Sequence, residues 1–231
     1  MCADSPRSGD RPGSVYELIR EDIISGRLAS NERVKIAELA KRFGTSTIPV
    51  REALQRLGGE GMVVLEPNRG ARVRPIDADF VRDIIEIDAM IEAAMTRWFV
   101  SVATKADLAE LENIQAEIEA DGFADRTLHG HLDVKFHRLI YDRHYNRHAI
   151  DLWWKNRQIL RAINRRLPTS LSRQAALLQE HHELIDCIRA QDADGAAAVV
   201  ARHVEGGGQH MMQQMGVAQR NEHLSQENAA P

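Results

Sequence analysis

Residues 36–57 read IAELAKRFGTSTIPVREALQRL and decide the fold of the first part of the chain. Four apolar side chains, spaced by three and four residues from Ile36 onward, predict one amphipathic helix. Gly44 is expected to end this helix, because glycine tolerates the left-handed backbone that often follows a helix. The hydroxyls of residues 45–47, followed by Pro49 in a first turn, predict a second helix directly afterwards. The stretch therefore predicts a helix-turn-helix.

The second predicted helix separates its apolar residues from its polar ones. Its apolar stripe consists of Val50, Ala53, Leu54 and Leu57. The opposite face carries hydrogen-bond donors of the kind that reach phosphates and base edges in a major groove. With Lys35 just before the first helix, the donors predicted to contact DNA are Lys35, Ser46, Thr47, Arg51, Gln55 and Arg56.

A basic hairpin is predicted after the second helix. The apolar run at 62–65 and the alternating run at 71–74 flank a turn that reads Pro-Asn-Arg-Gly. Arg69 at its tip is expected to enter a minor groove. Gly70 permits the tight turn, and Arg72 is expected to approach a phosphate.

This part of the chain is basic, although the chain as a whole is not. Residues 33–74 contain nine Lys or Arg against four Glu, while the whole chain carries a formal net charge of −4. Amphipathic helices and exposed arginines are common individually. In the order helix, tight turn, helix and basic hairpin, they predict a winged helix-turn-helix that binds double-stranded DNA.

The remainder predicts a second, all-α domain. Apolar positions recur at helical spacing from residue 77 to 215, strand signals are nearly absent, and six or seven helices are expected. The predicted organisation is a disordered arm, a winged domain, a helical bundle and a disordered tail, at residues 1–12, 13–76, 77–215 and 216–231.

Composition indicates a cytoplasmic protein. The 231 residues include only two cysteines, Cys2 and Cys187, so no disulfide framework is expected. No apolar run approaches the roughly 20 residues that a membrane-spanning helix needs. The sequence therefore predicts no membrane association.

One carboxylate and three histidines of the predicted bundle form a candidate metal site. Asp133 and His137 are four residues apart and share a helical face. His181 and His203 come from two later helices, and such a set suits Zn, Ni, Mn or Fe. Chance is the alternative, because the chain has ten histidines. The five expected at the surface are His129, His131, His144, His148 and His210.

A metal site also raises the possibility of an enzyme, for example a hydrolase fused to a DNA-binding domain. A zinc ion with three protein ligands can activate water. The sequence offers no convincing general base and no nucleophile motif, so the chain is predicted not to be an enzyme.

The N-terminal motifs resemble those of the GntR family of bacterial transcription regulators. The resemblance is carried by SVYELIREDIISGRL at 14–28, PVREALQRL at 49–57 and PNRGARV at 67–73. It implies a winged helix-turn-helix that acts as a homodimer on a palindromic operator. Many members carry Arg where this chain has Thr47, so a different base readout is expected there.

The second half is similar to the FCD effector-binding domain of the FadR-like branch of this family. There, an Asp-x-x-x-His pair and two later histidines bind a metal ion, and the matching residues here are Asp133, His137, His181 and His203. The resemblance implies a regulator, expected to be a repressor, that is controlled by a small metabolite such as an organic acid or a sugar derivative. A regulator that senses the metal ion itself is the alternative.

One departure from the family pattern concerns the effector pocket. Members commonly carry an Arg four residues before a Glu in the first helix of this domain, where this chain has Asp88 and Glu92. An aspartate there would repel an anion. Either the effector is neutral, cationic or polyhydroxylated, or Arg157 or Arg161 replaces the missing arginine. These four residues form the predicted pocket.

Overall fold

The computed structural model describes residues 13–66, 70–165 and 167–228, with 218–228 as backbone only. The chain divides into two compact units between Phe80 and Val81. The predicted arm at 1–12 and the hairpin tip with Arg69 lie outside the described residues. None of the helices in the described ranges is both long enough and apolar enough to cross a membrane.

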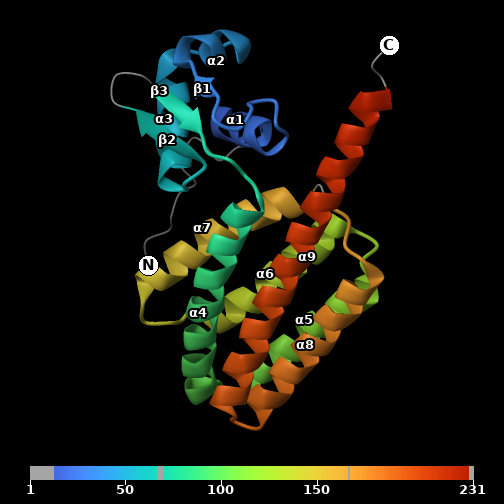
Figure 1. Cartoon of the computed structure of the whole chain (residues 1–231). Helices are drawn as coiled ribbons and strands as arrows, with labels where there is room; N and C mark the ends of the chain where they lie inside the picture. The colour runs from blue at the N-terminus through green and yellow to red at the C-terminus, as the bar shows by residue number, and fades with distance from the viewer. Residues whose placement is uncertain (1–12, 67–69, 166, 229–231) are drawn as a thin grey trace. The chain divides into compact units, whose positions relative to one another are not determined.

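The first unit is a winged helix-turn-helix, as predicted (Figure 1). Its elements are α1 (Val15–Ile24), β1 (Arg33–Val34), α2 (Ile36–Arg42), α3 (Thr47–Gly59), β2 (Val63–Glu66) and β3 (Gly70–Val73). The three strands form an antiparallel sheet in the order β1-β3-β2. Sequence periodicity did not predict β1, because two residues are too few to show an alternating pattern.

The turn between α2 and α3 follows the predicted chemistry. Gly44, which follows the C-cap residue Phe43 of α2, adopts a φ of 61°, the left-handed conformation that glycine tolerates best. Ser46 is the N-cap residue of α3. The buried residues of α3 are those of the predicted apolar stripe, namely Val50, Ala53, Leu54 and Leu57. The polar side of α3 is therefore turned away from the core of this unit.

The second unit is a bundle of six helices within the described residues. They are α4 (Ala78–Val102), α5 (Lys105–Asp121), α6 (Arg126–Tyr141), α7 (Arg147–Asn164), α8 (Leu171–Arg189) and α9 (Ala193–Asn228). Helix α9 packs along α8, and α5 packs against both α6 and α8 (Figure 1). Large buried side chains such as Phe99, Phe136 and Trp153 fill the space between the helices.

The C-terminal segment corrects one prediction. Residues 216–231 were expected to be disordered, but α9 continues to Asn228. After Gly216 the sequence contains no glycine and no proline before residue 231, and it includes several Ala, Gln and Glu residues, which favour helix. Polar composition alone therefore did not indicate disorder here.

Helix α9 contains three consecutive glycines, at residues 206–208, and therefore has no side chains at these positions. A Cβ atom at Gly208 would lie 2.5 Å from Cγ1 of Ile85 on α4, so this glycine permits close packing of α4 and α9. A Cβ atom at Gly207 would meet only Nη2 of Arg173, at 3.9 Å. The two glycines therefore have different structural roles.

These roles predict opposite effects on stability. Gly207→Ala is expected to raise the free energy of unfolding by about 0.5–1 kcal/mol, because alanine is the better helix former. Gly208→Ala is expected to lower it by about 1–3 kcal/mol, because the added methyl group overpacks the contact with Ile85. Urea denaturation of both variants checks this, and a Gly208→Ala protein at least as stable as Gly207→Ala would contradict it.

Candidate metal centre and nucleic-acid interface

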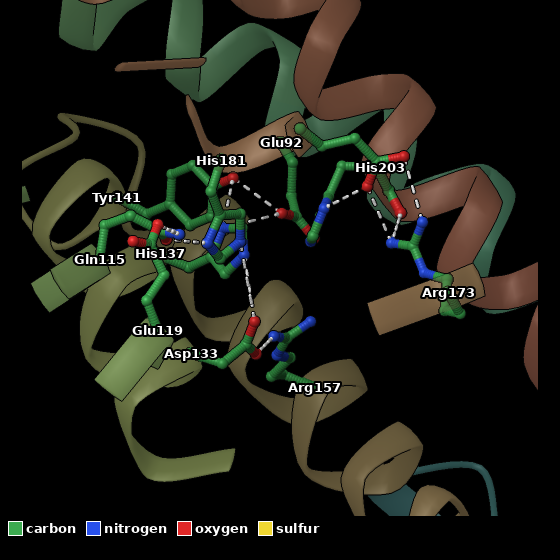
Figure 2. A network of polar contacts seen from close by, with 11 residues as sticks. Glu92, Gln115, Glu119, Asp133, His137, Tyr141, Arg157, Arg173, His181 and His203 are labelled. Carbon is green, nitrogen blue, oxygen red and sulfur yellow. Dashed lines mark hydrogen bonds and ion pairs between the residues drawn. The ribbon is translucent and has the colours of Figure 1, made fainter. Parts of the chain in front are cut away.

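Three helices of the bundle bring the four predicted metal ligands together. Asp133 and His137 lie on α6, His181 on α8 and His203 on α9. One ligand atom from each residue lies within 4.8 Å of the ligand atoms of the other three. All four residues are at least nine-tenths buried. Figure 2 shows Asp133, His137 and His181 meeting, with Arg157 beside Asp133.

The spacing of these atoms suits one divalent ion. Nε2 of His137 lies 3.8 Å from Oδ1 of Asp133, and Nε2 of His181 lies 3.9 Å from the same oxygen. Two ligands that are each bound about 2.1 Å from one ion stand roughly 3–4 Å apart. The residues can therefore hold an ion after only small movements of their side chains.

The far nitrogens of two histidines are held by neighbouring side chains. Nδ1 of His181 donates to Oε1 of Gln115 at 2.9 Å, and the amide group of Gln115 is oriented by donating to Glu119. Nδ1 of His203 donates to Oε2 of Glu180 at 2.9 Å. Such contacts fix the ring orientation and leave the lone pair on Nε2, as is typical of metal-binding histidines.

The nitrogens that face the cluster include two without a partner. Nε2 of His137 and Nε2 of His181 are buried and form no hydrogen bond with any described residue. Leaving a buried polar atom unsatisfied costs about 1–3 kcal/mol. A bound metal ion would remove this cost at both nitrogens at once.

The protonation states also suit metal binding. Burial lowers the pKa of His137 and of His181 well below the usual value, so both rings are neutral. Burial alone would raise the pKa of Asp133, but the adjacent Arg157 guanidinium holds it below its usual range. Arg157 forms an ion pair with Asp133. The cluster therefore presents the Asp133 carboxylate and the neutral imidazoles of His137 and His181.

A cavity of about 900 Å³ opens beside this cluster. All four predicted pocket residues line it, namely Asp88, Glu92, Arg157 and Arg161. Asp133 and His203 line it as well, so the cavity reaches the candidate metal ligands. Its size is in the range of small-molecule binding sites.

The two acidic residues of the cavity are buried and hydrogen-bonded. Asp88 accepts a hydrogen bond from Nδ2 of Asn156 at 2.7 Å, and Glu92 accepts one from the Tyr141 hydroxyl at 2.7 Å. Burial, followed by the nearby charge of Glu92, raises the pKa of Asp88 to about 8. Asp88 is therefore mostly protonated, and so uncharged, at pH 7. The sequence predicted that an aspartate at this position would repel an anionic effector, and protonation removes most of that repulsion.

Several residues of this site were not predicted from the sequence. They contact the proposed ligands, the acidic residues of the cavity or each other, and are Gln115, Tyr141, Asn156, Arg173 and Glu180. No motif marks them, because all of these contacts except the one between Arg173 and Glu180 join residues far apart in the chain. His144 was predicted to lie at the surface, and this prediction is wrong. Its side chain is only 5% exposed and packs against Trp98.

In the first unit, most predicted DNA contacts lie on the exposed side of α3. Ser46, Thr47, Arg51 and Gln55 are exposed. Lys35 is also exposed and pairs with Glu38 at 2.7 Å. Ile48 was not predicted as a contact, but its side chain is 65% exposed in the first turn of α3. An apolar group at such a place can contact a thymine methyl group.

Arg56, which was also predicted to contact DNA, has partners within this unit. Its guanidinium lies 3.9 Å from the centre of the Tyr16 ring and pairs with Glu60 at 3.3 Å. Arg56 follows Glu52 by one turn and lies at the border of the buried stripe. It therefore links α3 to α1, while 37% of its side chain stays exposed.

In the wing, Arg72 is partly exposed and already has partners. It donates to Oε1 of Glu66 at 3.0 Å and to the carbonyl oxygen of Asn31 at 2.8 Å. Gly70 adopts a φ of 89°, and a Cβ atom there would lie 2.8 Å from the carbonyl oxygen of Val34. Gly70 thus shapes the hairpin, whereas Arg72 must give up or share its contacts to reach a phosphate.

Comparison with known proteins matches both units to described families. Residues 13–73 match the family of bacterial regulatory proteins named gntR, and residues 83–206 match the FCD domain. The galactonate operon transcriptional repressor of Escherichia coli (strain K12) is 29% identical over 182 residues, which cover 69% of this chain and 78% of that protein.

Two further proteins extend the comparison. The HTH-type transcriptional repressor RspR of Escherichia coli (strain K12) is 26% identical over 196 residues, covering 83% of this chain and 84% of that protein. Among solved structures, the metal-free FCD domain of the regulator TM0439 has a TM-score of 0.51 and 22% identity. It covers 62% of this chain and 99% of that domain.

Proposed function

The chain belongs to the GntR family of bacterial regulatory proteins and carries an FCD domain, and we propose that it is a metal-containing repressor controlled by a small metabolite. Its relatives are transcription regulators, so the chain is a DNA-binding regulator and not an enzyme. The proposal concerns how it reads DNA, what it binds in the bundle and how the two are linked.

For DNA, we propose that two copies bind the two halves of a palindromic operator. Helix α3 of each copy would enter a major groove, with Arg51 and Gln55 reaching base edges or phosphates. Ile48 would add an apolar contact beside them. The hairpin would approach the neighbouring minor groove through Arg69.

For the bundle, we propose that Asp133, His137, His181 and His203 hold a divalent ion such as Zn, Ni, Mn or Fe. The observation that carries this is the pair of buried Nε2 atoms on His137 and His181 that have no described partner. The ion would supply a positive centre that binds an oxygen atom of a ligand in the cavity. Asp88, Asn156 and the arginines of the cavity wall would orient the rest of the ligand.

The effector would act by linkage. A ligand that contacts α4, α6, α7 and α9 at once favours the arrangement of these helices that fits it best. It changes operator occupancy only if the DNA-bound and DNA-released arrangements bind it with different affinity. A difference of a few kcal/mol is sufficient for a large shift.

The test is operator binding by purified full-length protein that is first chelated and then reloaded with Zn. Organic acids, sugars and amines are added in turn, and DNA binding is followed by fluorescence anisotropy. The proposal expects acids or sugar acids to release the operator from Zn-loaded protein only. Release by chelation alone would support a metal sensor, and release by amines or neutral sugars without metal would contradict the proposed role of the ion.

A further inference from the structure

One wall of the cavity carries an arginine that the metal cluster does not use. Arg157 and Arg161 are one turn apart on α7, and both line the cavity. Arg157 is engaged by Asp133. Arg161 is half-buried, and within the described part of the chain it has no hydrogen bond or ion pair.

The other arginines that line the cavity either donate to acceptors or are exposed to solvent. Arg126 donates to the carbonyl oxygens of Asn164 and Leu167 at the end of α7. Arg173 pairs with Glu180 at 2.9 Å. Arg165 is exposed to solvent at the end of α7. Arg161 thus differs from them, since it is a half-buried positive charge for which the described residues provide no acceptor.

The side chain of Arg161 reaches across to α6. A Cβ atom at Gly130 would lie 3.5 Å from Nη2 of Arg161, so the absence of a side chain at Gly130 leaves room for the guanidinium. His129, the adjacent residue, also lines the cavity, and its buried Nδ1 has no partner among the described residues. Burial and the neighbouring charges of Arg157 and Arg165 lower the pKa of Arg161, and the charge of Asp133 offsets only part of this effect.

The position of Arg161 relative to the metal cluster follows from helix geometry. Four residues separate it from Arg157, which corresponds to about 6 Å along α7. On α6, Gly130 precedes Asp133 by three residues. Gly130 lies beside Arg161 and Asp133 beside Arg157, so both helices lead away from the cluster in the same direction. A positive group therefore stands about one helical turn beyond Arg157, the residue that pairs with Asp133, along the same wall.

We propose that the effector is an acid with two anionic groups, one directed to the metal site and the other bound by Arg161. The inference rests on the proposed function, because it requires a ligand at that site. A guanidinium binds a carboxylate or a phosphate through paired hydrogen bonds, so either can be the second group. Acids with one anionic group would leave Arg161 unpaired and would bind more weakly.

The test measures binding of matched acids to the Zn-loaded full-length protein by isothermal titration calorimetry. The probes are succinate and adipate, with two carboxylates, 2-phosphoglycolate, with a carboxylate and a phosphate, and butyrate, with one carboxylate. At least one two-anion probe is expected to bind about tenfold or more tightly than butyrate, because a hydrogen-bonded ion pair is gained. The better of the carboxylate and phosphate probes identifies the second group.

Variants of the protein distinguish a specific contact made by Arg161 from a general effect of positive charge on the binding of acids. Arg161→Gln is expected to weaken the two-anion probe by about 10- to 100-fold and to leave butyrate within about threefold. Arg161→Lys keeps the charge and should recover part of the loss. Lys155→Gln is the matched control, because it removes one positive charge from an exposed position of the same helix that does not line the cavity.

Each outcome has a distinct meaning. Equal binding of butyrate and the two-anion probes, unaffected by Arg161→Gln, would overturn this inference and leave the proposed metal-linked effector site intact. A loss in Arg161→Gln that is equal for butyrate would also overturn it, since the role would then be structural. Failure of every acid to bind Zn-loaded protein that still binds DNA would overturn both the inference and the effector part of the proposed function.

Discussion

Replacing His137 with alanine is expected to abolish metal binding and the stabilisation that the metal provides. The variant removes one of four proposed ligands, whereas loss of an outer contact to a metal-bound histidine already weakens binding by about 10- to 100-fold. A metal at 100 times its dissociation constant stabilises the native state by about 2.7 kcal/mol. For a chain of this size the corresponding rise in Tm is roughly 5–10 °C, and His137→Ala should show none of it.

His182→Ala provides the control for this experiment. His182 is adjacent to the proposed ligand His181, but its side chain is 57% exposed and pairs with Glu119. Thermal unfolding with added Zn, and after chelation, should therefore give the wild-type shift for His182→Ala. A full metal-dependent shift in His137→Ala would show that the ion binds elsewhere.

Replacing Arg51 with alanine is expected to weaken operator binding without destabilising the fold. Arg51 is exposed on α3, opposite the buried stripe. The loss should be about 1–3 kcal/mol for the specific operator if Arg51 contacts a base. If it contacts a phosphate, binding to all sequences should weaken alike, and the dependence on salt should become less steep. Fluorescence anisotropy on operator and scrambled DNA at several salt concentrations separates the two roles.

Arg56→Ala, on the same helix, is expected to behave in the opposite way. Its guanidinium packs on the Tyr16 ring and pairs with Glu60. The variant should therefore lower the stability of the first unit while leaving the affinity of the folded protein for operator nearly unchanged. Unchanged operator affinity in Arg51→Ala would remove Arg51 from the proposed interface, and a large loss of affinity in a stable Arg56→Ala protein would restore Arg56 to it.

Local sequence patterns were sufficient to predict the elements that depend mainly on residues close together in the chain. The turn at Gly44, the buried stripe of α3 and the hairpin all follow from short-range periodicity and backbone preference. The tail from residue 216 was expected to be disordered, whereas α9 continues to Asn228 within the described residues, in a segment whose composition favours helix.

The metal ligands were predicted from residue types and from a family resemblance, but their arrangement was not. Asp133 and His137 share a helix, so their proximity follows from spacing. His181 and His203 join them only through the packing of α8 and α9. The same packing supplies Gln115 and the other supporting contacts, which no motif indicates.

The sequence by itself determined the two-part organisation, the helix-turn-helix and the identity of the candidate ligands. Periodicity and spacing depend only on residues close together in the chain, so both can be read directly from the sequence. Only the tertiary structure decided that Asp88 is buried beside Asn156, that Arg157 is engaged by Asp133 and that Arg161 has no such partner among the described residues. Burial and charge pairing depend on which helices meet, and residues far apart in the sequence set the state of each group.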